Sequence, residues 1–137
     1  MEKRLTAEGL EKGDEAWIVV DRDHWDETHL DALHAWSQEK GNRGFALSNP
    51  KFEYWLLLHF EDGVGIRSAG DCDRRLRAHM PDYRKSLASA SITESGIREA
   101  IRRARNRDRP PTSGWPREPG QTTVYRLVER ILFRPDA

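Results

Sequence analysis

Two short apolar runs separated by an amphipathic segment constrain the fold of this chain more than any other feature. Residues 16–21 hold the continuous run Ile-Val-Val, and residues 45–48 hold Phe-Ala-Leu-Ser. A continuous apolar run is typical of a strand buried on both faces of a parallel sheet. Residues 27–40 carry apolar side chains near helical spacing, and this pattern stops at Lys40-Gly41. Strand, helix and strand in this order predict parallel strands joined by a right-handed crossover.

The rest of the chain predicts mainly helices. Asn49-Pro50 follows the second apolar run, and we expect Asn49 to order this turn as the N-cap of a helix over residues 51–60. Further helices are predicted over residues 71–79, 97–107 and 124–132, with a capping box at Ser91–Glu94 and a Pro- and Gly-rich loop over residues 109–121. We therefore predict an α/β fold: a small parallel sheet core with helices packed on it and a mainly helical C-terminal half.

Composition narrows the class of protein. The 137 residues fit one domain, residues 1–137, in which residues 1–15 form a polar N-terminal extension. The formal net charge is zero, so any binding of nucleic acid must come from a local patch. The single cysteine, Cys72, excludes an internal disulfide and suits a reducing cytoplasm. No secretory signal is visible, and the longest apolar run, around residues 55–58, is too short to span a membrane.

Asp21 and Asp23 follow the first apolar run directly. In a parallel sheet, ligands bind beyond the carboxyl ends of the strands, and residues i and i+2 of an extended strand point to the same side. Two carboxylates placed in this way can share Mg²⁺, which takes one or two protein carboxylates together with water and phosphate. The alternatives are that both acids are solvated or that they cap the following helix.

Glu53 is an acid within an otherwise apolar segment, residues 51–60. It is either a first-turn acid that interacts with the helix dipole or a third acid recruited to the strand edge. The only dense basic cluster is the run of arginines between residues 98 and 109, which includes Arg102 and Arg103. These two residues and Lys85 are candidate phosphate contacts, and an ordinary solvated helix face is the alternative.

Several motifs together resemble the RloB-like proteins. They are "VVDRDHW" at residues 19–25, "SNPKFEYWLLLHF" at residues 48–60, "AIRRAR" at residues 100–105 and "TTVYRLVERI" at residues 122–131. This resemblance implies a Toprim-like fold, in which a D-x-D pair and a glutamate bind Mg²⁺, or Mn²⁺, near a phosphodiester. Asp21 and Asp23 take the place of the D-x-D pair. The resemblance also implies a role in bacterial anti-phage defence, with an ATPase as a partner.

The sequence departs from the RloB-like pattern at its start. Members of that family begin with an apolar strand that ends in a glutamate, some tens of residues before the D-x-D pair. Only twenty residues precede Asp21 here, and none of them forms such a strand. We therefore expect this chain to lack the glutamate-bearing strand, and Glu53 is the candidate replacement. A sheet without its first strand exposes an edge, which favours a homodimer or a partner strand.

Three functions remain open at this point. The first is a magnesium-associated nuclease that acts on nucleic-acid phosphodiesters through Asp21, Asp23 and Glu53. The second is a non-catalytic, truncated Toprim-like module that binds a defence ATPase or nucleic acid. The third is a nucleotide-binding sensor that uses the same strand edge.

Overall fold

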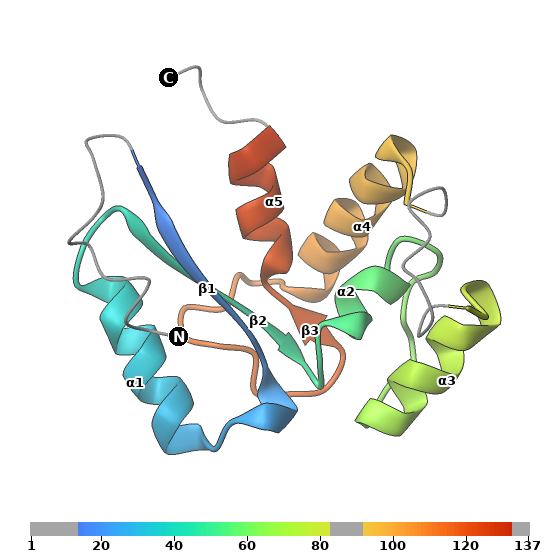
Figure 1. The fold of residues 1–137 in the computed structure, drawn as a ribbon, viewed down its shortest axis with the longest axis horizontal. Helices are drawn as coiled ribbons and strands as arrows, with labels where there is room; N and C mark the ends of the chain where they lie inside the picture. Colours follow the sequence, from blue (N-terminus) through green and yellow to red (C-terminus); the bar gives the residue numbers. More distant parts are fainter. Residues whose placement is uncertain (1–13, 83–91, 133–137) are drawn as a thin grey trace.

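The computed structural model describes residues 14–82 and 92–132. The elements in chain order, shown in Figure 1, are β1 (Ala16–Asp21), the 3-10 turn η3 (Arg22–His24), α1 (Glu27–Gln38), β2 (Arg43–Asn49), α2 (Glu53–Leu57), α3 (Ala69–His79), α4 (Glu94–Arg107), β3 (Gln121–Thr122) and α5 (Val124–Leu132). The fold is therefore mixed α/β, with a small sheet and a mainly helical second half, as the sequence predicts.

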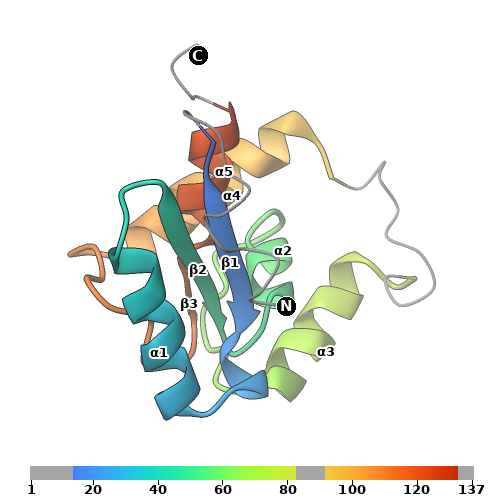
Figure 2. The same ribbon diagram turned by 60° about the vertical axis from the view of Figure 1, so that its left-hand side comes forward.

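The sheet contains the predicted parallel pair. β1 and β2 run parallel, with Ala16 opposite Arg43 and Asp21 opposite Ser48, and α1 connects them. β3 was not predicted, because it has only two residues and the first of them, Gln121, lies in the predicted Pro- and Gly-rich loop. It runs antiparallel to β2 and pairs only with Ser48 and Asn49. The strand order is β1-β2-β3, so β1 forms one edge of the described sheet (Figure 2).

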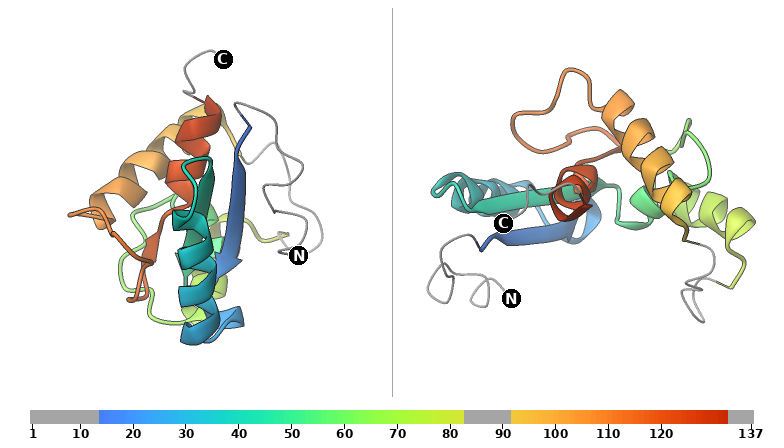
Figure 3. Two further views of the ribbon diagram at one scale, coloured as in Figure 1. Left: turned by 90° about the vertical axis from the view of Figure 1, so that its left-hand side faces the viewer. Right: turned by 90° about the horizontal axis from the view of Figure 1, so that it is seen from above.

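Two apolar clusters cover the two faces of the sheet, because successive side chains of a strand alternate between faces. On one face, Ile18 and Phe45 pack with Leu30 and Leu33 of α1 and with Trp115. On the other face, Ala46 packs with the apolar sides of α2, α3, α4 and α5. Figure 3 shows α5 lying between the sheet and α4. Each face therefore has its own core, and the carboxyl ends of β1 and β2 meet beside α2.

The first helix after β2 differs from the prediction. α2 begins at Glu53 and ends at Leu57, so it is shorter than the predicted helix over residues 51–60. Asn49 does not cap it: Asn49 is the last residue of β2, its bond to Pro50 is cis, and its side-chain amide donates to the carbonyl of Pro116 at 3.0 Å. The predicted N-cap was wrong because the tertiary structure uses this amide to hold the loop before β3.

The other predicted helices are present. α3 and α5 match residues 71–79 and 124–132 closely. α4 begins three residues before the predicted position, and its N-cap is Thr93, whose hydroxyl accepts from the Gly96 N–H. The predicted cap Ser91 lies outside the described residues. None of the helices within residues 14–82 and 92–132 is long and apolar enough to cross a membrane.

Candidate functional site

Asp21 lies where β1 ends and helps to build the start of α2. Its Oδ1 accepts a hydrogen bond from the Phe52 backbone N–H at 2.8 Å. The first N–H groups of a helix have no partner within the helix, so an acid from another element can satisfy one of them. Asp21 thus stabilises the turn that carries Glu53, the first residue of α2. The second oxygen, Oδ2, lies 3.4 Å from Nδ1 of His24.

Two of the predicted acids, Asp21 and Glu53, lie close enough for the charge of Glu53 to affect the pKa of Asp21. The pKa of Asp21 is raised above its ordinary value of 3.8, chiefly because burial penalises the charged form. The hydrogen bond from Phe52 and the charge of His24 lower this pKa, while the charge of Glu53 raises it. Glu53 and Asp21 therefore repel each other across the end of β1, although the two residues are far apart in the sequence.

Asp73 of α3 joins the same region, and sequence analysis missed it. Nζ of Lys51 lies 3.1 Å from Oδ1 and 3.2 Å from Oδ2 of Asp73. The pKa of the Cys72 thiol is raised to about 12, chiefly by burial and in addition by the charges of Asp73, Glu53 and Asp21. These three acids, which we call the acidic edge, come from α3, α2 and β1. Nothing local in the sequence marks Asp73, because α3 reaches this position only through tertiary packing.

Asp23 does not have the geometry assumed for it. The strand ends at Asp21, and residues 22–24 form η3, so the rule that i and i+2 point to one side of a strand does not apply here. The Asp23 backbone N–H donates to the carbonyl of Pro50 at 3.0 Å, and its side chain is exposed. The extended pairing that we expected was therefore wrong, and a shared cation at Asp21 and Asp23 stays a prediction.

A cation at the acidic edge would have to be held by few carboxylates. Among the residues that the structure describes, no group of three or more His, Cys, Asp or Glu side chains is arranged to hold a metal ion. Mg²⁺ commonly uses only one or two protein carboxylates and keeps several waters. Asp21, at the end of β1, and Glu53, the first residue of α2, are the two carboxylates that would hold such a cation, and its binding there stays a prediction.

The predicted phosphate contacts lie elsewhere. The Arg103 guanidinium donates to the carbonyl of Leu58 at 2.7 Å and lies 3.2 Å from Asp62, and its side chain is 18 % exposed. Arg103 thus satisfies the carbonyl of the residue that follows α2 and links this helix to α4. Arg102 is 54 % exposed and contacts Glu99 at 2.6 Å on the surface of α4. Lys85 lies outside the described residues. Neither of the two described arginines contacts a residue of the acidic edge through a hydrogen bond or ion pair.

Comparison with known proteins gives one match. Residues 2–131 match the family model described as RloB-like protein. The match includes the residues that we interpreted as a polar extension. Searches of the curated proteins and of the solved structures each gave no match.

Proposed function

This chain belongs to the RloB-like family, and from that premise we propose that it is a Mg²⁺-associated protein that acts on nucleic-acid phosphodiesters in bacterial anti-phage defence. Mn²⁺ is the alternative cation. The nuclease chemistry and the role in defence come from the sequence resemblance. The acidic edge is the part of the molecule to which we assign the chemistry.

One observation carries this proposal: Asp21 closes β1 and its Oδ1 accepts from the Phe52 N–H at 2.8 Å, so the end of β1 is joined to the turn that carries Glu53, the first residue of α2. The charge of Glu53 raises the pKa of Asp21, and the charges of His24 and Lys51 lower it. A divalent cation held by these acids would neutralise charge on a phosphodiester during attack. The side chain of Asp21 is 17 % exposed, so it remains accessible to a hydrated ion.

Each residue then has a distinct role. Asp21, whose Oδ1 accepts from Phe52, and Glu53, in the first turn of α2, would hold the cation, which would supply charge neutralisation at the phosphodiester. Lys51 adds a positive charge beside the same edge, balanced by Asp73. Asp23, exposed on η3, would lie outside the residues that hold the cation and would accept a hydrogen bond from water at that edge. Arg102 and Lys85 stay predicted contacts to the phosphate backbone, and Arg103 is reassigned to structure.

A cleavage assay with matched variants tests the proposal. Labelled single-stranded, duplex and transfer-RNA substrates are incubated with Mg²⁺, Mn²⁺ or EDTA. We expect metal-dependent cleavage that is lost in Asp21→Asn and in Glu53→Gln and kept in the surface control Glu118→Gln. Asparagine retains an acceptor for the Phe52 N–H, so the folded structure is preserved. Cleavage that persists in EDTA, or in both variants, contradicts the proposal.

The open edge of β1 supports a second candidate, a binding module that pairs with an ATPase or with a second copy of this chain. Within the described sheet, β1 pairs on one side only, and Val19 on this strand is 40 % exposed. Exposed strand edges pair readily with other chains, and lysine on such an edge prevents pairing. We expect Val19→Lys to abolish dimerisation in light scattering, while Val64→Lys, a change at another exposed apolar residue, leaves it intact. A monomeric wild-type protein at high concentration excludes the second copy.

A further inference from the structure

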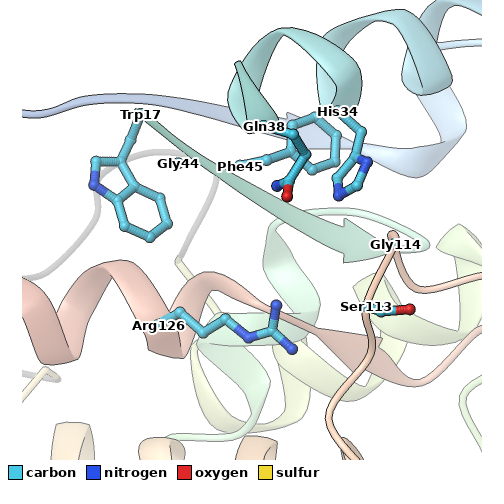
Figure 4. A pocket seen from close by; sticks show the side chains of 8 residues that line it. All are labelled: Trp17, His34, Gln38, Gly44, Phe45, Ser113, Gly114 and Arg126. Carbon is cyan, nitrogen blue, oxygen red and sulfur yellow. The ribbon is translucent and has the colours of Figure 1, made fainter. Parts of the chain in front are cut away.

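A cavity of about 180 Å³ lies at the opposite end of the strands from the acidic edge. Figure 4 shows the residues that surround it, which lie on both sides of β2. They are contributed by β1, α1, β2, the loop before β3 and α5, and are Trp17, His34, Gln38, Gly44, Phe45, Ser113, Gly114 and Arg126. The cavity is therefore distinct from the site assigned above, and nothing in the proposed phosphodiester chemistry uses it.

The cavity adjoins an unpaired stretch of β2. In a parallel pair, alternate residues direct their backbone groups toward the neighbouring strand. Ala16 donates to the carbonyl of Asn42, and Thr123 donates to the carbonyl of Leu47 on the other side. By this alternation the N–H and C=O of Phe45 point away from β1, toward the cavity. β3 pairs only with Ser48 and Asn49, and no group in the described residues is hydrogen-bonded to the Phe45 backbone.

Three of the residues that line the cavity, Trp17, His34 and Phe45, are aromatic. The Trp17 indole lies directly on Gly44, where an added Cβ would come within 2.4 Å of the ring. Its Nε1 donates to Glu15 at 3.0 Å, which fixes the orientation of the ring. His34 and Phe45 meet edge to face with their ring centroids 5.7 Å apart. A planar ligand therefore has aromatic surface to stack on beside an unpaired donor and acceptor.

We propose that this cavity binds the heterocyclic base of a nucleoside or nucleotide. A base such as adenine carries a ring-nitrogen acceptor next to an amino donor, which complements the N–H and C=O of Phe45. A ligand that covers these two backbone groups and hydrogen-bonds to both of them avoids leaving them unpaired, so it gains affinity over one that only stacks. The cavity is smaller than the ~300 Å³ at which pockets for drug-sized ligands begin, so it encloses a base and leaves the sugar and phosphate outside.

Binding by the full chain is tested with adenosine in isothermal titration calorimetry. Gly114 lines the cavity, and a Cβ added there meets no atom within 4 Å, so Gly114→Leu adds bulk at the cavity wall without a clash at the Cβ. Gly41 has the same free surroundings but does not line the cavity, which makes Gly41→Leu the matched control. We expect saturable binding in the wild type and in Gly41→Leu, and at least a roughly tenfold weaker affinity in Gly114→Leu.

A change in the ligand tests the same contact without altering the protein. N6,N6-dimethyladenosine keeps the aromatic rings but cannot donate to the Phe45 carbonyl, so it should bind about tenfold more weakly than adenosine. AMP and an oligodeoxyadenylate separate the two sources of the base, a free nucleotide and a single-stranded nucleic acid. Absence of saturable binding by all of these ligands, or equal affinity for adenosine and its dimethyl derivative, overturns the proposal and leaves only water at Phe45. The variants Asp21→Asn and Glu53→Gln leave this cavity intact. A failure of adenosine binding can therefore be told apart from a failure of metal-dependent cleavage at the acidic edge.

Discussion

The carboxylate of Asp21 accepts a hydrogen bond from the backbone N–H of Phe52 at 2.8 Å, across 31 positions of sequence. This contact ties the carboxyl end of β1 to the first turn of α2. It gives Asp21 two roles that can be separated: its oxygen is an acceptor that shapes the chain, and its charge is part of the acidic edge. The first role needs only an acceptor, whereas the second needs the negative charge.

The two roles of Asp21 predict opposite effects for two substitutions. Asp21→Ala removes the acceptor and should lower the free energy of unfolding by about 1 kcal/mol at pH 7. Asp21→Asn keeps an acceptor and removes a charge whose pKa is raised on folding, so it should leave stability unchanged or increase it. Urea denaturation measures both. A raised pKa means that ionisation of Asp21 costs stability as the pH rises above 3.8, so any gain from Asn should disappear in acid.

Asp108 should control the stability of the loop that leads to β3. It is 1 % exposed and accepts from the Thr112 backbone N–H, the Thr112 and Tyr125 hydroxyls and the Arg126 guanidinium. Burial alone would raise its pKa, but these donors lower it below 3.8 overall. Its contribution is therefore complete above the ordinary pKa and is lost as the pH falls through the lowered value.

Removal of the Asp108 charge tests this network. We expect Asp108→Asn to lower the free energy of unfolding by about 2 kcal/mol at pH 7, because Arg126 loses its charged partner. Tyr125→Phe removes a single donor and should cost about 1 kcal/mol. Chemical denaturation between pH 2 and pH 7 gives both values. Equal stability of Asp108→Asn and the wild type at pH 7 would contradict the assignment.

Gly44 should tolerate no side chain. A Cβ at this position would lie 2.4 Å from two ring atoms of Trp17 and 2.5 Å from a third, and the two residues are direct partners in the β1–β2 register. We expect Gly44→Ala to destabilise the fold by about 1–3 kcal/mol, as overpacking does in well-packed cores. Gly41→Ala, which meets no atom within 4 Å, serves as the control in the same thermal melts. A Gly44→Ala melting temperature equal to that of the control would show that the indole can move away.

The two arginines of α4 should behave differently. Arg103→Ala removes the donor to the Leu58 carbonyl and the ion pair with Asp62, so we expect a loss of about 1–2 kcal/mol in unfolding free energy. Arg102→Ala breaks only an exposed pair and should change stability by less than about 0.5 kcal/mol. In salt-dependent binding to nucleic acid, Arg102→Ala is the variant expected to weaken affinity. The reverse pattern in the two assays would return Arg103 to the phosphate contacts.

The acidic edge shows what local patterns can and cannot predict. The position of Asp21 at the end of a strand followed from one apolar run and the geometry of parallel sheets. The geometry of Asp23 could not follow, because the chain leaves the extended conformation at Arg22 and forms η3. Asp73 and the Asp21–Phe52 contact depend on how α2 and α3 pack on the sheet.

The sequence by itself determined the parallel pair of strands and the helix between them, because apolar periodicity acts within one element. It also determined α3, α4 and α5 to within a few residues, and the family. Only the tertiary structure decided which acids meet Asp21, what Asn49 and Arg103 bind, and that Phe45 faces a cavity. These features depend on contacts between elements distant in the chain, and no residue pattern within one element encodes such distances.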